Sequence, residues 1–230
     1  MSTRQAPNLA WEMAALSDGC SLVAGCDEVG RGSLGGPVSV GVVVLGLGAL
    51  GHESPDDTPE LSRFTPVGLA DSKLLSPGSR EGLLPEIRRW AAGSAVGHAS
   101  AAEIDEFGIM RALRLAGERA VDLLPQRPER FLLDGNFDWF GRPDRVPVSP
   151  LECVVSPVEL RVRADMECAS VAAASVMAKV ERDRLMVELA ATYPGYGWEA
   201  NKGYGSPEHM AALRELGPCK EHRRSWRLVP

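Results

Sequence analysis

Two adjacent acids end an apolar run and lead directly into a glycine-rich turn. Asp27 and Glu28 follow residues 21–26, and Gly30-Arg31-Gly32 begins one residue later. Because neighbouring side chains of a strand point to opposite faces, a sheet cannot bury both carboxylates comfortably unless a positive group meets them. A divalent cation is the usual positive group, and glycines let a backbone approach a phosphate closely. The segment is therefore a candidate for metal-assisted phosphate chemistry, although an Asp–Glu pair alone is more often solvated surface.

The spacing of Gly30, Gly32 and Gly35 matches the dinucleotide-binding fingerprint Gly-x-Gly-x-x-Gly. That fingerprint requires a helix to begin at the glycines. Residues 37–45 are instead rich in valine and begin with a proline, which favours a strand. The glycines are therefore expected to join two strands as a hairpin, and a Rossmann fold is rejected.

Two further acids stand at predicted element ends. Asp134 ends the apolar run 130–134, and Asp165 precedes an alanine-rich stretch predicted as a helix from Met166 to about Ala190. Each also has an ordinary structural explanation: Asp134 could be a turn residue, and Asp165 could be a helix N-cap. Four acids at such ends form a more specific pattern, because an α/β sheet exposes its functional edge there. Oxygen-only ligands favour Mg²⁺ or Mn²⁺ over zinc, and without metal some of the four pKa values should rise.

The elements that must position these acids are predicted from periodicity and from capping signals. Ser76 and Pro77 have the residue types of a helix N-cap and a first helical position. The predicted strands cover 20–28, 37–45, 94–99, 130–134 and 151–156, and the predicted helices cover 76–90, 101–107, 109–124, 166–190 and 206–216. Residues 46–70 are predicted as a long surface loop. We expect a catalytic domain over 18–190, with a helical C-terminal part and basic tail over 191–230 packed on it.

Composition bounds the class of protein. A chain of 230 residues can bury about 70–75% of its unfolded surface, so a full core needs no covalent staples. The five cysteines show no paired spacing and the four histidines are scattered, which argues against a disulfide framework or a histidine-based zinc site. No signal peptide or membrane-length apolar run is present, so we expect a cytoplasmic protein without membrane contact. The net charge of -6 argues mildly against nucleic acid, but bases cluster at Lys202 and over 220–227, so the average charge decides nothing.

Six sequence blocks follow one another over nearly the whole chain, from about residue 22 to residue 227. They are Gly25-Cys26-Asp27-Glu28-Val29-Gly30-Arg31-Gly32, Asp71-Ser72-Lys73-Leu74-Leu75-Ser76, Leu133-Asp134-Gly135-Asn136, Ala164-Asp165 with residues 169–183, Asn201-Lys202-Gly203-Tyr204-Gly205-Ser206 with His209, and Gly217-Pro218 with residues 222–226. Together they resemble the motifs of ribonuclease HII, the type 2 ribonuclease H family. One departure is Glu167, where the family commonly has a basic residue, so no phosphate contact is inferred there. The related ribonuclease HIII usually carries an extra N-terminal domain, whereas only about twenty residues precede the first predicted strand here.

The resemblance implies an α/β fold of the ribonuclease H type, with a mixed five-stranded sheet flanked by helices and a helical C-terminal extension. It implies an endonuclease that cuts the RNA strand of RNA–DNA hybrids and cuts 5′ of single ribonucleotides embedded in duplex DNA. The implied two-metal-ion hydrolysis leaves 3′-hydroxyl and 5′-phosphate ends. By match to the family motifs, the catalytic and metal-binding residues are Asp27, Glu28, Asp134 and Asp165, with Mn²⁺ or Mg²⁺ as cofactor. The substrate-binding residues implied in the same way are Gly30, Arg31, Gly32, Ser72, Lys73, Lys202 and Tyr204. We expect a monomer whose partner is the hybrid or the ribonucleotide-containing duplex.

Several residues, and the function itself, keep alternatives at this stage. Tyr204 could stack on a deoxyribose at an RNA–DNA junction or be a packed aromatic in a glycine-rich turn. Lys179 and Arg182 could be structural, and Arg223 and Arg224 could bind phosphate or form a solvated tail. A DNA-acting relative, such as a transposase or junction resolvase, would share the acids but lack the sugar-reading glycines and tyrosine. A non-catalytic nucleic-acid-binding module would lack at least one of the acids, whereas all four are present.

Overall fold

The computed structural model describes residues 6–46, 65–141 and 156–228, and its centre is a mixed five-stranded sheet. The strands are β1 (Leu22–Val29), β2 (Val38–Gly46), β3 (Gly93–Ala99), β4 (Arg130–Asp134) and β5 (Val158–Arg161). Their order across the sheet is β3-β2-β1-β4-β5. β2 runs antiparallel to β1 and β3, whereas β4 runs parallel to β1 and β5. The predicted hairpin of the first two strands and the predicted mixed sheet are both confirmed.

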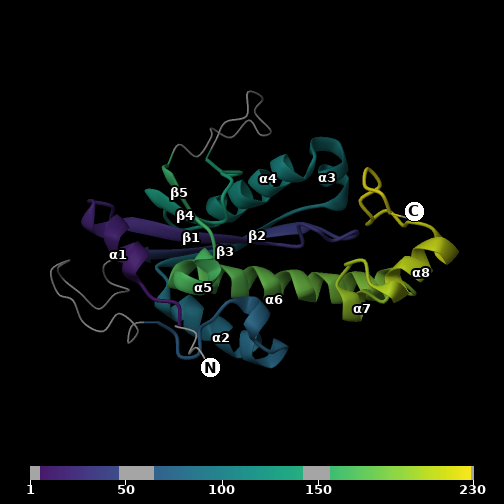
Figure 1. The fold of residues 1–230 in the computed structure, drawn as a ribbon, viewed down its shortest axis with the longest axis horizontal. Helices are drawn as coiled ribbons and strands as arrows, with labels where there is room; N and C mark the ends of the chain where they lie inside the picture. The colour runs from purple at the N-terminus through teal and green to yellow at the C-terminus, as the bar shows by residue number, and fades with distance from the viewer. Residues whose placement is uncertain (1–5, 47–64, 142–155, 229–230) are drawn as a thin grey trace.

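Helices cover both faces of the sheet and enclose two separate apolar cores (Figure 1). On one face, α4 (Ile109–Asp122) packs on β2 and β3, and α3 (Ala101–Phe107) leads into it. On the other face, α6 (Ala169–Thr192) packs on β1 and β2, and α2 (Pro77–Trp90) packs against α6. Because both faces are covered, functional groups must come from the ends of the strands.

Small residues let α6 lie very close to the sheet. Gly25 on β1 faces the backbone of Ser170, and Gly41 on β2 faces the backbone of Ala174. A Cβ atom added at either glycine would overlap those backbone atoms. A backbone cannot move aside as a flexible side chain can, so the two glycines fix the separation of helix and sheet. This packing holds the first turns of α6 beside the end of β1.

The long helix predicted from Met166 is wrong at its start. Asp165 lies in a separate short helix, α5 (Ala164–Glu167). Cys168 then takes an extended conformation, with φ -104° and ψ 124°, before α6 begins. Asp165 is therefore carried by an independent turn of helix and does not cap the long one.

The N-terminal segment causes this interruption. It contains a helix that was not predicted, α1 (Ala10–Ser17). Just before it, the N–H group of Asn8 donates to the carbonyl oxygen of Glu167 at 3.0 Å. Glu12 on α1 is fully buried and accepts a hydrogen bond from the N–H group of Ser170 at 2.7 Å. These contacts satisfy peptide groups that a continuous helix would have used internally, so tertiary structure overrides the local helix propensity.

Three other segments differ from the expectations or lie beyond the described residues. The predicted strand over 151–156 lies outside them except for Ser156, and the strand beside β4 is Val158–Arg161. Most of the predicted loop, residues 47–64, also lies outside. The second sequence block forms a short 3-10 helix, η3 (Ser72–Leu74), which was not predicted.

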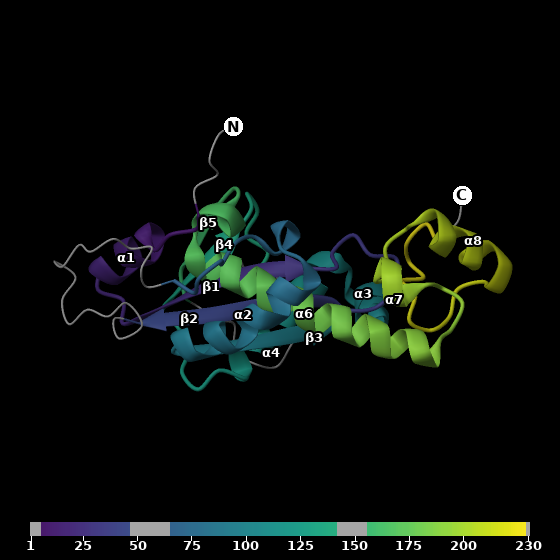
Figure 2. The same cartoon turned by 90° about the horizontal axis from the view of Figure 1, so that it is seen from below.

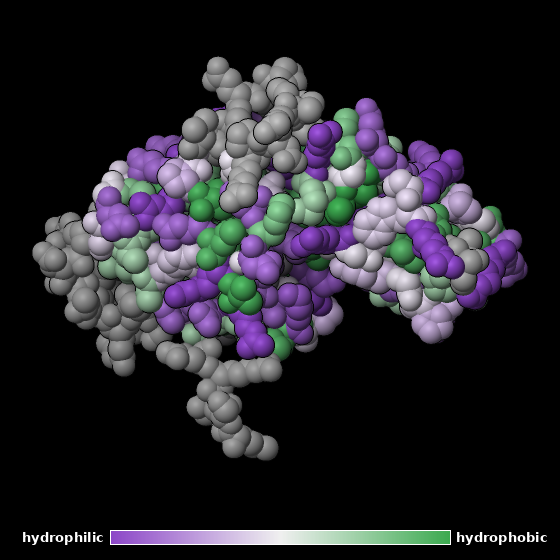
Figure 3. All heavy atoms as spheres, turned by 45° about the horizontal axis from the view of Figure 1, so that its top comes forward, coloured by the Kyte–Doolittle hydropathy of each residue, from purple (hydrophilic) through white to green (hydrophobic). Residues whose placement is uncertain are grey.

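The C-terminal helices α7 (Trp198–Asn201) and α8 (Pro207–Leu216) form a lobe at the far end of α6 (Figure 2). A third core, which includes Trp198 and Met186, joins this lobe to α6. Figure 3 shows the lobe set off from the main body by a hollow on the face turned to the viewer. The domain boundary near residue 190 stays a prediction, since α6 continues across it. No helix in the described part of the chain is long and apolar enough to cross a bilayer.

Gly41→Ala should destabilise the fold, because its methyl group would press on the backbone of α6. We expect the free energy of unfolding to fall by about 1–3 kcal/mol, measured by urea denaturation. Gly82→Ala is the matched control, since Gly82 lies exposed on α2 with open space around it. The same substitution there should stabilise by about 0.5–1 kcal/mol. Equal effects of the two variants would contradict the packing argument.

Candidate active site

The four predicted acids come from neighbouring elements at one end of the sheet. Asp27 and Glu28 lie near the end of β1, and Asp134 ends the parallel strand β4 beside it. The Asp134 Oδ1 atom accepts a hydrogen bond from the N–H group of Ala164 at 2.7 Å, which ties the end of β4 to α5. Asp165 follows on α5, and Asp27 and Asp165 are each only 6% exposed. The structure thus gathers acids that the sequence places far apart.

Their electrostatics show that the acids act on one another. Burial raises the pKa of Asp27 well above its usual range, and the charges of Glu28, Asp134 and Asp165 raise it further. Burial and the charge of Asp165 likewise raise the pKa of Asp134. The pKa of Glu28 is raised by burial, although Arg31, 3.6 Å away, opposes this. The expected rise in carboxyl pKa values is confirmed.

Lys73 on η3 supplies a positive charge at the edge of the cluster. Its Nζ atom donates to Asp165 Oδ2 at 3.0 Å and lies 3.9 Å from Asp71 Oδ1. Burial alone would lower the pKa of Lys73, but the hydrogen bond to Asp165 and the charges of Asp71 and Asp27 raise it. Ser72 beside it is buried, and its N–H group donates to a serine hydroxyl on α6 at 3.1 Å. The second sequence block therefore places the Lys73 ammonium against the acids, and the hydrogen bond of Ser72 anchors this block to α6.

The donor set fits a hard divalent cation, because it consists of carboxylate oxygens whose repulsion a cation would relieve. Within the described ranges, however, no three Asp, Glu, His or Cys side chains are already arranged to hold a metal ion. Three of the four acids already have separate partners within the chain. Asp134 accepts from a backbone N–H, Asp165 from Lys73, and Glu28 faces Arg31. Convergence of all four carboxylates on shared ions therefore stays a prediction.

The glycine turn, residues 30–37 between β1 and β2, lies against the turn that carries Tyr204. Gly30 has a φ of 82°, a conformation that favours glycine, and Arg31-Gly32 is exposed beyond it. The N–H group of Leu34 donates to the carbonyl oxygen of Gly203 at 2.9 Å, which joins the two turns. The Tyr204 residue is 38% exposed, so it is not a packed core aromatic. The structure therefore brings together the residues implied to read the sugar.

Two arginines, Arg182 and Arg223, support the glycine turn from its buried side, and no local signal in the sequence indicates this role for Arg223. Arg223 is fully buried and donates to carbonyl oxygens of the turn, so both of its alternatives, phosphate ligand and solvated tail, are wrong. Its neighbour Arg224 is exposed. Arg182 is also fully buried and donates to the carbonyl oxygen of Pro37 at 2.9 Å, which confirms its structural interpretation. A tight glycine-rich turn leaves backbone carbonyl oxygens that need hydrogen-bond donors. The sequence alone does not identify the side chains that provide these donors.

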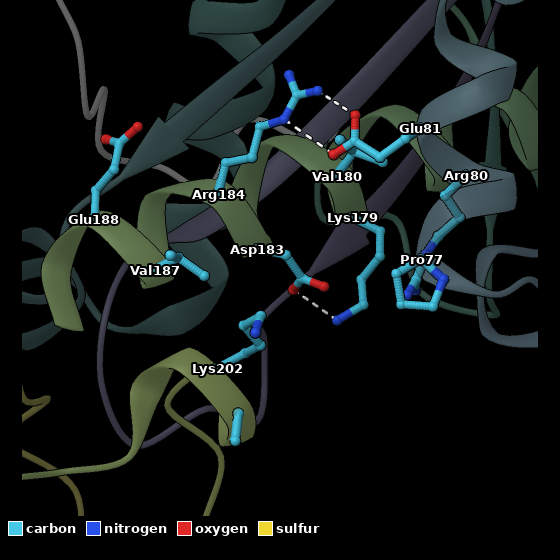
Figure 4. A pocket seen from close by; sticks show the side chains of 11 residues that line it. Pro77, Arg80, Glu81, Lys179, Val180, Asp183, Arg184, Val187, Glu188 and Lys202 are labelled. Carbon is cyan, nitrogen blue, oxygen red and sulfur yellow. Dashed lines mark hydrogen bonds and ion pairs between the residues drawn. The ribbon is translucent and has the colours of Figure 1, made fainter. Parts of the chain in front are cut away.

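A pocket of about 540 Å³ lies between α2, α6 and α7, and none of the four acids lines it (Figure 4). Lys179 and Asp183 pair across one turn of α6 at 2.7 Å, and Arg184 pairs with Glu81. The Lys202 side chain lines this pocket, and it makes no hydrogen bond or ion pair with the acids in the described structure. Lys202 is thus an implied substrate residue that has no direct contact with the four acids.

A buried histidine pair holds the backbone of Tyr204. The indole N–H of Trp198 donates to His209 Nε2 at 3.1 Å, so the proton of His209 lies on Nδ1 and is donated to the carbonyl oxygen of Tyr204 at 2.8 Å. His222 Nε2 lies 3.0 Å from His209 Nε2, and the N–H group of Cys219 donates to His222 Nδ1 at 3.1 Å. Each ring therefore already accepts a hydrogen bond on its unprotonated nitrogen, and a second proton on either ring would break this network.

Comparison with known proteins decides the family. The family model for ribonuclease HII matches residues 24–229. A ribonuclease HII from Streptomyces avermitilis is 43% identical over 208 residues, which are 90% of this chain and 78% of that protein. The chain belongs to the ribonuclease HII family. It is therefore a hydrolase, an endonuclease of the ribonuclease H type that acts on RNA–DNA hybrids, and neither the DNA-acting nor the non-catalytic alternative holds.

Solved structures agree with this assignment in fold. The ribonuclease H2 from Pyrococcus horikoshii OT3 is 25% identical to this ribonuclease HII with a TM-score of 0.64. The RNase HII of a PCNA:RNase HII complex from Archaeoglobus fulgidus is 29% identical with the same TM-score of 0.64. Each likeness covers 90% of this chain and 95% of the other. The predicted ribonuclease H-like fold, with its flanking helices and helical C-terminal region, is confirmed.

Asp27→Asn should stabilise this ribonuclease HII in chelator at neutral pH, because it removes a buried charge that three other acids repel. A carboxyl with a raised folded-state pKa favours folding when protonated, and that contribution is lost as pH rises. We expect a melting temperature about 2–4 °C higher, the shift that 1 kcal/mol gives in a chain of this size. The gain should vanish below about pH 4, where the wild-type carboxyl is protonated in both states. Asp122→Asn, at a surface acid paired with Arg127, should change little, and a lower melting temperature for Asp27→Asn would contradict the electrostatic argument.

The histidine pair should make the ribonuclease HII acid-sensitive. Burial lowers the pKa of His209, and burial together with the charge of His209 lowers the pKa of His222 to about 4. The unfolded chain binds a proton at about pH 6.5, so stability should fall as pH drops from about 6.5 to 4, by about 2–3 kcal/mol for His222. Urea denaturation at several pH values should show a smaller fall for His222→Gln than for the wild type. His98→Gln is the control, and an identical pH slope in all three proteins would refute the assignment.

Proposed function

We propose that this ribonuclease HII also cuts duplex DNA on the 5′ side of a single embedded ribonucleotide, leaving 3′-hydroxyl and 5′-phosphate ends. Family membership supports cleavage of hybrids, and the glycine turn beside Tyr204 supports the narrower substrate. Only the 2′-hydroxyl distinguishes such a ribonucleotide from its DNA neighbours. Phosphate contacts carry no such information, so the enzyme needs a group beside its acids that contacts the sugar itself.

The observation that carries this proposal is the joining of the two turns next to the acids. Gly30 follows Glu28 by only two residues, and the bond from Leu34 to Gly203 holds the Tyr204 turn against the glycine turn. A glycine backbone can approach a sugar closely, and an exposed aromatic ring can stack on the deoxyribose that follows. Two such groups side by side suit a junction between a ribonucleotide and DNA and do not suit uniform DNA.

For catalysis, we propose that Asp27, Glu28, Asp134 and Asp165 hold two divalent ions, Mn²⁺ or Mg²⁺. Their burial, mutual repulsion and all-oxygen chemistry support this assignment. Bound ions would supply an activated water and stabilise the charge that develops on the leaving 3′-oxygen. Within the chain itself, the Lys73 ammonium donates a charge-assisted hydrogen bond to Asp165 at 3.0 Å, which helps to hold that side chain in place.

Phosphate binding is proposed for Lys73 and Lys202. Lys73 is exposed and Lys202 is half-exposed, so both ammonium groups can meet a phosphate backbone. Ser72 is buried, and we propose that it contributes by positioning Lys73 through its anchor on α6.

We further propose that the enzyme works as a monomer in the cytoplasm, which light scattering of the purified chain and fractionation of cells would test.

Tyr204→Ala should slow cleavage at a single embedded ribonucleotide by about tenfold or more, since loss of 1.4 kcal/mol of transition-state stabilisation has that effect. Duplex affinity should change by less than about twofold, because phosphate contacts dominate it. The measurement is kcat/KM on a labelled duplex with one ribonucleotide, with Mg²⁺ or Mn²⁺, and the 5′ side of that nucleotide should be cut. Tyr204→Phe, which keeps the ring, is the control. The proposal fails if Tyr204→Ala cuts as fast as wild type, or if an all-DNA duplex is cut equally well.

A further inference from the structure

Arg182 and Arg223 form a buried arginine pair behind the glycine turn. Both residues are 0% exposed, and neither forms an ion pair with a carboxylate in the part of the chain that the structure describes. Burying a guanidinium without an anion is costly unless other polar groups meet its donors. Here backbone carbonyl oxygens meet them. Natural proteins keep such costly arrangements mainly where function requires them.

Arg223 sets the orientation of two peptide groups in the turn. Its guanidinium donates to the carbonyl oxygens of Gly30 at 2.6 Å and of Arg31 at 2.9 Å. No described peptide bond is cis, and the N–H of a trans peptide points opposite to its C=O. The N–H groups of Arg31 and Gly32 therefore point away from Arg223, on two exposed residues, and neither donates to any other described group. The turn thus presents two adjacent backbone donors to solvent beside the acids.

Arg182 connects the same turn to Tyr204. Its guanidinium donates to the carbonyl oxygens of Gly35 at 3.2 Å and Pro37 at 2.9 Å on one side, and of Lys202 at 3.0 Å on the other. The guanidinium carbon also lies 5.5 Å from the centroid of the Tyr204 ring, within the range of a cation–π contact. One side chain therefore fixes the glycine turn relative to the tyrosine.

We propose that Arg182 and Arg223 are positioning residues for ribonucleotide recognition. They hold the N–H groups of Arg31 and Gly32 toward the 2′-hydroxyl oxygen and hold Tyr204 beside them. The inference rests on the proposed function and assigns to these two arginines the task of keeping the turn in one conformation. Glycines sample many conformations, so a turn without this support would aim its donors at the sugar only part of the time. A buried positive charge also polarises the peptides that it binds, which strengthens their N–H groups as donors.

A binding comparison separates recognition from folding. Two duplexes, identical except that one carries a single ribonucleotide, are titrated with wild type, Arg223→Lys and Arg182→Lys, with Ca²⁺ in place of Mg²⁺ to slow turnover. Wild type should bind the ribonucleotide duplex about tenfold more tightly than the all-DNA duplex. In both variants that preference should fall to about twofold or less, because one ammonium cannot hold carbonyls spread as a guanidinium fork holds them. Affinity for the all-DNA duplex should stay within about twofold, because phosphate contacts remain.

Arg184→Lys is the matched control, since Arg184 lies two residues further along α6 but is exposed and paired with Glu81. It should keep the wild-type preference. The inference is overturned if both lysine variants keep that preference, or if they lose affinity equally for both duplexes, which would show a phosphate contact or a general structural role. If melting curves show that one variant is unfolded, the other carries the test. A wild type that neither prefers nor cuts the ribonucleotide duplex would instead overturn the proposed function.

Discussion

Repulsion among carboxylates held where β1, β4 and α5 meet is the constraint on which the rest of this structure depends. Asp27 is buried beside Glu28, Asp134 and Asp165, and its raised pKa reflects that environment. Such a cluster persists only when contacts elsewhere fix the backbone that carries it. Lys73 offsets part of the repulsion from the edge of the cluster. A divalent cation bound by the proposed site would offset the remainder, so the same charge arrangement that destabilises the fold prepares it for a metal.

Supports far from the acids in the sequence supply that fixed backbone. The contacts of Gly25 and Gly41 with α6 hold the long helix against the strands, so the end of β1 cannot shift alone. The N-terminal segment interrupts the helix at Cys168, which leaves α5 free to bind Asp134 through the N–H group of Ala164. On the substrate side, Arg223 holds the glycine turn in the same way. Rigid elements and buried donors thus position groups that would otherwise separate.

Local signals in the sequence predict the acids but not these supports. Asp27 and Asp134 could be placed because each stands near the end of an apolar run that reads as a strand. The break at Cys168 could not be predicted, because an alanine-rich stretch favours one continuous helix. The segment that interrupts this helix lies near the N-terminus, far away in the sequence. Arg223 stands among bases that resemble a solvated tail, and its burial depends on carbonyls of a turn that the local sequence does not reveal. Tertiary contacts decide each of these cases.

Calorimetric titration with Mn²⁺ tests most directly the central claim that the four acids form one cation site. The wild-type chain should bind Mn²⁺ and release protons in mildly acidic buffer, because carboxyl groups with raised pKa values must ionise in order to bind. Asp134→Asn should weaken binding by about tenfold or more, a loss of 1.4 kcal/mol, while the surface variant Asp122→Asn should bind as the wild type does. Equal Mn²⁺ affinity in the wild type and Asp134→Asn, or no binding by the wild type, would contradict this account.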